Sequence, residues 1–273
     1  MKQKFVWAIG VVVAISGRSY SASALSEYDA EVVLTHSGAE TVLTVRSVRA
    51  IPRVLIRLAE EYGWMATFEE VTVAYPGDMI DMTSPTYHPT GPDDRALDPR
   101  TAPLSIRFRT PQQGNSMQDD EVAALNVLLK AHLAANLPGQ YRVLPSRDGI
   151  PQVVPSAARN SAGSLMPVVP LMDEHVTLPN DPNRTVLKTV QAILEQVGTK
   201  AKVKIGLTGL TDNRLNALFP NQMDDRPARE ILDLIISTLH MKCWTVLYNP
   251  SSKTHLLVFP LTNLHSLALA SPR

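Results

Sequence analysis

The sequence contains one cysteine, Cys243, among 273 residues. An intramolecular disulfide is therefore impossible. Cys243 precedes Trp244 in the middle of a predicted strand, and we expect a buried, inert thiol because free cysteine is among the most frequently buried residue types. A role as nucleophile would require a histidine that the fold brings next to the thiol.

Common catalytic motifs are also missing. The sequence has no Walker glycine loop, no G-x-G-x-x-G after a predicted strand, no G-x-S-x-G, no H-E-x-x-H and no cysteine pair. These absences weigh against the nucleotide-binding, hydrolase and zinc-enzyme classes that the motifs identify. The seven histidines never stand four residues apart on one predicted helix, so we expect no metal site. The sequence predicts no cofactor.

A surplus of basic charge is absent as well. Lysine and arginine total 26, and aspartate and glutamate also total 26. The first 24 residues hold three of the basic residues and no acid, so 23 basic residues remain against 26 acidic ones beyond them. Nucleic-acid binding normally needs a basic surplus, and we therefore do not expect a nucleic-acid partner.

No apolar run approaches the ~20 residues that a membrane-spanning helix needs. The run at Phe5–Ser16 follows the basic segment Met1–Lys4 and precedes the small-x-small pattern Ala22-Ser23-Ala24. This order predicts a signal peptide over residues 1–24, cleaved after its last residue, and a periplasmic or secreted protein with no permanent membrane span. An uncleaved anchor remains the alternative because Arg18 lies before the cleavage site, and the lack of a nearby cysteine excludes a lipoprotein.

What the chain does contain is enough apolar sequence, 44%, for one large or two small cores. We expect a first module at residues 27–155. Its helices are predicted from apolar stripes and from residues that start or stop helices, and Asp119-Asp120 fit the start of the second one. The expected elements are a strand at Thr41–Val48, a helix at Ile51–Tyr62 closed by Gly63, a strand at Trp64–Val73, a proline-rich loop at 76–103, a strand at Leu104–Arg109, a helix from Asp119 or Asp120 to Asn136, and a hairpin at Tyr141–Leu144 and Gln152–Val154.

A second module is predicted at residues 173–260, after a linker at 156–172 and before a flexible tail at 261–273. Its last helix begins near Pro227, and Asp224-Asp225 fit the start of that helix. We expect Arg229, Glu230, Asp233 and Ser237 to form its polar face, opposite the apolar residues Ile231, Leu232, Leu234, Ile235, Ile236 and Leu239. The other expected elements are strands at Glu174–Leu178 and Lys202–Leu207, a helix from Arg184 to Val197 ended by Gly198, and a hairpin at Lys242–Tyr248 and Thr254–Phe259.

The two halves share one order of elements: strand, helix, strand, irregular stretch, helix, hairpin. This order predicts an approximate tandem repeat, with the first copy enlarged by the loop. The fold class is therefore predicted as α+β, with two tandem small α/β sandwich modules, each having two helices packed on a small mixed sheet.

The second module also resembles a known family. The segment Val176-Thr177-Leu178-Pro179, the helix at Thr185–Gly198, the strand at Val203–Leu207, and the helix and hairpin at Pro227–Phe259 resemble the STN domain, the short module at the N-termini of secretins and TonB-dependent receptors. The resemblance implies a periplasmic interaction module and not an enzyme. Because no secretin pore or receptor barrel follows in this sequence, we expect no translocation through the chain itself.

The first half carries a second resemblance. Tyr62-Gly63-Trp64, Thr67-Phe68-Glu69 and Gly77-Asp78 are similar to segments of uncharacterised exported proteins of soil bacteria, in which a diverged module precedes an STN-like one.

The loop at 76–103 and its border hold the candidate binding residues, which combine carboxylates, aromatic rings and an imidazole: Tyr75, Asp78, Tyr87, His88, Asp93 and Asp94. Loops of this length are usually functional or disordered, although turns commonly collect solvated aspartate. We expect an exported, non-catalytic protein that binds another envelope protein through a sheet edge or through this loop. The alternative is an exported hydrolase that acts on glycan or peptide with loop carboxylates.

Overall fold

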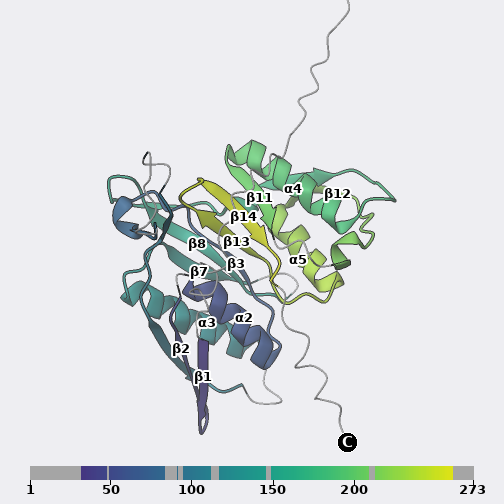
Figure 1. The fold of residues 1–273 in the computed structure, drawn as a ribbon. Helices are drawn as coiled ribbons and strands as arrows, with labels where there is room; N and C mark the ends of the chain where they lie inside the picture. The colour runs from purple at the N-terminus through teal and green to yellow at the C-terminus, as the bar shows by residue number, and fades with distance from the viewer. Residues whose placement is uncertain are drawn as a thin grey trace, which may run out of the picture.

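A computed structural model describes residues 32–47, 49–83, 91, 95–111, 117–145, 149–208 and 213–260. The predicted signal peptide and the predicted tail lie outside these residues. The structure confirms the α+β class, with four sheets in the described part of the chain. Figure 1 shows the elements of the N-terminal half, in purple and teal, beside the green and yellow elements of the C-terminal half.

The N-terminal half contains the predicted helices with small shifts at their ends. Gly63 closes the first helix in the left-handed conformation, with φ 71°, as glycine permits without a steric penalty. The elements are β1 (Val32–Ser37), β2 (Glu40–Val45), α2 (Ala50–Tyr62), β3 (Thr67–Glu69), the 3-10 helix η1 (Pro76–Asp78), β4 (Met79–Asp81), β5 (Leu97–Pro99), β6 (Leu104–Arg109), α3 (Met117–Ala134), β7 (Gln140–Leu144) and β8 (Gln152–Arg159).

The C-terminal half follows the same pattern. Thr185 caps α4 by accepting a hydrogen bond from the Lys188 backbone N–H at 3.3 Å, which satisfies one of the unpaired donors at a helix start. The elements are β9 (Leu165–Pro167), η3 (Leu171–Asp173), β10 (His175–Leu178), α4 (Val186–Ala201), β11 (Lys204–Thr208), η4 (Asn213–Asn216), β12 (Met223–Pro227), α5 (Ala228–Thr238), β13 (Thr245–Asn249) and β14 (Thr254–Val258).

The largest sheet joins both halves and contains the same three-strand unit twice. Its order is β11-β14-β13-β3-β8-β7, with β9 paired to β8. Within each unit the first strand pairs in parallel with the last, as β3 with β8 and β11 with β14. Each unit also has an antiparallel hairpin, β7–β8 or β13–β14. The units meet where β13 pairs in parallel with β3.

Helices cover this sheet on both faces. Val246 of β13 belongs to a core with Val190 of α4 and Ile231 of α5. The next residue, Leu247, packs against a second core that contains residues of α2 and α3. Because successive side chains of a strand point to opposite faces, α4 and α5 lie on one face and α2 and α3 on the other. The second core is completed by the separate sheet β1-β2-β6.

Several predicted boundaries were wrong. The glycine at 198 does not end α4, which continues to Ala201, and Lys202 takes the left-handed position with φ 57°. A Cβ at position 198 would lie 3.1 Å from Ile205 Cγ2 and from the Val203 carbonyl, so this glycine allows the chain after the helix to pack closely. Asp224-Asp225 do not start a helix but lie in β12, paired with β10.

The two predicted irregular segments contain regular structure. Within the loop at 76–103, β4 and β5 pair in register from Met79↔Pro99 to Asp81↔Leu97. The predicted linker at 156–172 includes the end of β8, all of β9 and part of η3. Strand formation there follows from pairing with distant partners, which no local propensity reports.

Candidate functional site

Two of the six predicted binding residues line one open groove. Tyr75 and Asp78 border a hollow of about 460 Å³, together with Gly77, Arg100, Asn136, Arg159 and Gly163. The groove therefore combines η1 and the residue before it, the residue after β5, the segment that follows α3, the last residue of β8, and the turn between β8 and β9. Tyr87, His88, Asp93 and Asp94 lie outside the described residues.

Asp78 is the buried anchor of this groove. Its side chain is 4% exposed, and its Oδ1 lies 2.6 Å from Arg159 Nη1 and 3.6 Å from Arg100 Nη2. Arg159 Nη2 donates to Asn136 Oδ1 at 2.6 Å, and Arg100 Nη2 donates to the Asn136 carbonyl. Asp78 therefore lies beneath two guanidiniums and holds them in place.

A second polar cluster lies between α5 and β3, and the sequence analysis missed it. Arg229 and Asp233, predicted on the polar face of α5, are only 5% and 1% exposed. Arg229 Nη1 donates to Gln152 Oε1 at 3.1 Å, and Gln152 donates to Asp233. Trp244 Nε1 donates to the other oxygen of Asp233 at 2.8 Å. The Arg–Asp spacing of four was the available signal, because residues four apart share one face of a helix.

Glu69 links this cluster to η3. Its carboxylate accepts hydrogen bonds from the backbone N–H groups of Leu171 and Met172 and lies 3.6 Å from Arg229 Nη2. Arg229 also contacts Asp173, with Nε 2.6 Å from Oδ1. Burial raises the pKa of Glu69 to about 7, although Arg229 and the two N–H groups oppose this shift.

The neighbouring Glu70 points to the opposite face and pairs with Arg49. Arg49 Nε lies 3.3 Å from Glu70 Oε2, and Arg49 Nη2 donates to the Tyr248 carbonyl at 2.9 Å. The Tyr248 N–H donates to the same carboxylate at 2.7 Å. Burial raises the pKa of Glu70, against the effect of Arg49. Both glutamates hold the two strand units together, and the cavity that Glu70 borders has a volume of only about 30 Å³, so we assign them to the fold.

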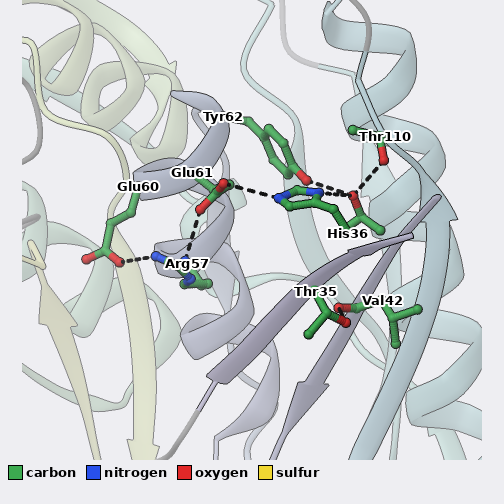
Figure 2. A network of polar contacts seen from close by, with 9 residues as sticks. Thr35, His36, Val42, Arg57, Glu60, Glu61, Tyr62 and Thr110 are labelled. Atoms are coloured by element: carbon green, nitrogen blue, oxygen red, sulfur yellow. Dashed lines mark hydrogen bonds and ion pairs between the residues drawn. The ribbon is translucent and has the colours of Figure 1, made fainter. Parts of the chain in front are cut away.

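A third arrangement has the outline of a catalytic triad. Figure 2 shows His36 with its ring directed toward Glu61, and Tyr62 and Thr110 close by. His36 Nε2 lies 3.4 Å from Glu61 Oε1 and Nδ1 lies 3.2 Å from Thr41 Oγ1. The Thr41 hydroxyl is also 2.9 Å from Tyr62 Oη and from Thr110 Oγ1. A nucleophile must reach its substrate, and Thr41 is fully buried, so we do not assign a catalytic role to this network. Its contacts join the β1–β2 hairpin to α2.

The predicted burial of the cysteine is confirmed. Cys243 is 1% exposed, and burial raises the pKa of its thiol to about 12. A thiol with this pKa is almost entirely protonated at neutral pH and is a poor nucleophile.

The described residues contain no group of three or more histidine, cysteine or acidic side chains arranged to hold a metal ion. Across the same residues, every helix is too short or too polar to span a lipid bilayer.

Comparisons of the chain with protein-family models, curated proteins and solved structures gave no match. The resemblance to the STN domain stays a prediction.

Proposed function

We propose that this protein is an exported, non-catalytic interaction protein of the cell envelope, and that it binds another protein by accepting a strand at the free edge of β1. The observation that carries the proposal is a difference between β1 and the other edge strands of the two larger sheets. Exposed edges present unpaired N–H and C=O groups, and proteins usually protect them with charge, proline or covering elements.

Each of the other edges has one of these protections. In the three-stranded sheet, β6 carries the exposed residues Arg107 and Arg109. In the seven-stranded sheet, β7 contains Arg142, β11 begins with Lys204, and the short β9 ends at Pro167. Cations repel a second basic strand, and proline lacks the N–H that an added strand would need.

The six residues of β1 provide neither of these two protections, since the strand, Val-Val-Leu-Thr-His-Ser, includes no proline and no lysine or arginine. It is held in register along its whole length by β2, from Val32↔Val45 to Ser37↔Glu40, and Val33 is 41% exposed. In an antiparallel pair, alternate residues turn their backbone groups away from the partner. A row of backbone donors and acceptors is therefore available to an extended segment, with side-chain contacts that provide selectivity.

The test is capture of a partner from envelope extract by the full chain and by edge variants. The double variant Val33→Lys, Thr35→Lys adds two cations to exposed positions of β1, and we expect it to lose the partner that the wild type retains. Ser105→Lys is the matched control, because it adds a cation at an exposed position of β6 on the opposite edge of the same sheet. Circular dichroism must show the same fold and melting temperature for both variants.

Equal recovery of the partner by wild type, the β1 double variant and the β6 control would disprove strand addition at β1. The proposed export of the protein is tested separately. N-terminal sequencing of the mature protein from cell fractions should show Leu25 as the first residue, and recovery of the intact N-terminus in the cytoplasmic fraction would contradict export.

A further inference from the structure

The groove bordered by Tyr75 and Asp78 differs from the other ionic clusters of the molecule in its balance of charge. Two guanidiniums, those of Arg100 and Arg159, surround the single carboxylate of Asp78. Among the described residues, no other acidic side chain lines the groove. The described lining therefore carries one net positive charge, whereas the Arg49–Glu70–Asp98 and Arg229–Glu69–Asp173 clusters each have two acids for one arginine.

The positive groups also lie on the accessible side. The Asp78 side chain is 4% exposed, while those of Arg100 and Arg159 are 33% and 28% exposed. A molecule that enters the hollow of about 460 Å³ thus meets guanidinium groups before it meets the carboxylate. Guanidinium is more weakly hydrated than ammonium, and its planar donor fork matches carboxylate and phosphate oxygens.

Both arginines are held in place before any ligand arrives. Asn136 receives one hydrogen bond from each of them, at its side-chain oxygen from Arg159 and at its carbonyl from Arg100. The backbone N–H of Arg100 donates to the Asp78 carbonyl at 2.7 Å. Each guanidinium has five N–H donors, and these contacts use only part of them. Fixed donors reduce the entropy that binding must overcome.

The wall of the groove is shaped by glycine and an aromatic ring. A Cβ at Gly163 would lie 3.1 Å from Tyr75 Cε2, and one at Gly77 would lie 2.4 Å from Tyr75 Cε1. Gly163 also has φ +85°, a conformation that side chains rarely adopt. The ring of Tyr75 therefore lies close to both glycines and forms one side of the hollow.

We propose that this groove is an oxyanion-binding site, in which Arg100 and Arg159 hold the oxygens of a carboxylate or phosphate group and Asp78 fixes the two arginines from below. The site does not involve the β1 edge, so a result that disproves one of the two proposals leaves the other unaffected.

The first experiment uses the unmodified chain and two probes, succinate and inorganic phosphate, at constant ionic strength. Phenylglyoxal modification of each arginine is followed by mass spectrometry. We expect a probe that binds to slow the modification of Arg100 and Arg159 and to leave the exposed Arg95 unaffected. Protection by succinate alone identifies a carboxylate ligand, and protection by phosphate alone identifies a phosphate ligand. Failure of both probes to protect either groove arginine overturns the proposal.

A variant pair gives a second measurement. Arg100→Gln removes the more exposed guanidinium and leaves the 2.6 Å contact between Asp78 and Arg159, so the fold should survive. By calorimetry we expect its Kd for the protecting probe to rise by at least about tenfold, because one charge-assisted interaction is lost. Arg95→Gln is the control, since Arg95 contacts Asp81 at 3.8 Å outside the groove. Equal Kd values for both variants would contradict the site.

Discussion

The two strand units of the large sheet, β3-β8-β7 and β11-β14-β13, have the same order and the same pairing directions, but their first strands differ in chemistry. β3 ends at Glu69, with Glu70 directly after it, and both are buried. β11, the corresponding strand, contains no acid and begins with Lys204. β3 has β13 as a neighbour on its other side, whereas β11 is an edge.

We call the contact between β13 and β3 the joint between the two strand units. The difference shows that the two glutamates belong to this joint and are not a feature of each unit. β13 and β3 pair in register at only two positions, Thr245↔Phe68 and Val246↔Glu69. Glu69 adds contacts to Arg229 on α5, and Glu70 adds contacts to Arg49 and to the Tyr248 N–H. β11 lies at the edge of the sheet and has no second unit to contact, so its first residue can be the exposed Lys204.

The largest expected effect comes from removing a cation at this joint. Arg229→Met leaves Glu69 and Gln152 without their buried partner, and we expect a loss of about 3–5 kcal/mol in the free energy of unfolding, as for other broken buried ion pairs. Lys204→Met at the exposed start of β11 is the control and should change stability by less than about 0.5 kcal/mol. Urea unfolding measures both. Equal losses would show that β3 and β11 have equivalent roles.

The class of fold could be predicted because it follows from local patterns. The apolar stripe of α2, its closing Gly63, and the hairpin β13–β14 are all encoded within short segments, where periodicity and turn residues are informative. The same logic failed for Arg229 and Asp233, whose burial depends on Gln152 and Trp244. Residues this distant in sequence carry no local signal of their contact.

The groove shows the same limit. Tyr75 and Asp78 were predicted as binding residues because they stand at the start of a long loop with mixed chemistry, and that role stays a prediction. Arg100 was within that loop but carried no pattern, and Arg159 lay in a segment predicted as linker. Their convergence on one carboxylate follows from the pairing of β4 with β5 and of β8 with β9, which a single sequence does not specify.

The next prediction concerns pH. It tests whether a carboxyl group at the joint makes the free energy of unfolding depend on pH. Glu69 has its pKa raised by burial to about 7 from a usual value of 4.5. Between these values the unfolded chain releases a proton that the folded chain keeps, so stability should fall as pH rises from about 4.5 through about 7. Glu69→Gln should flatten that part of the curve, measured by urea unfolding at each pH.

The control for this slope is Glu40→Gln, which alters an exposed carboxylate paired with Arg107 at the molecular surface. It should leave the decline between pH 4.5 and 7 unchanged. Glu121 also has its pKa raised by burial, to about 8, and Glu121→Gln should flatten the curve over a range that extends higher. A Glu69→Gln curve that matches wild type would show that Glu69 does not carry the response.

The smallest expected effect lies away from the joint, at the hydroxyl of Thr41. Thr41→Val keeps the shape of the side chain and removes its contacts with His36, Tyr62 and Thr110. We expect a cost of about 1 kcal/mol, because side chains at the surface such as His36 can replace the lost contact with water. Thr44→Val on the same strand is the control, since its only hydroxyl contact in the described structure is the exposed one to Ser105 at 3.3 Å. If Thr41→Val cost as much as Arg229→Met in urea unfolding, the joint would hold no special share of the stability, and the contrast between β3 and β11 would reflect burial alone.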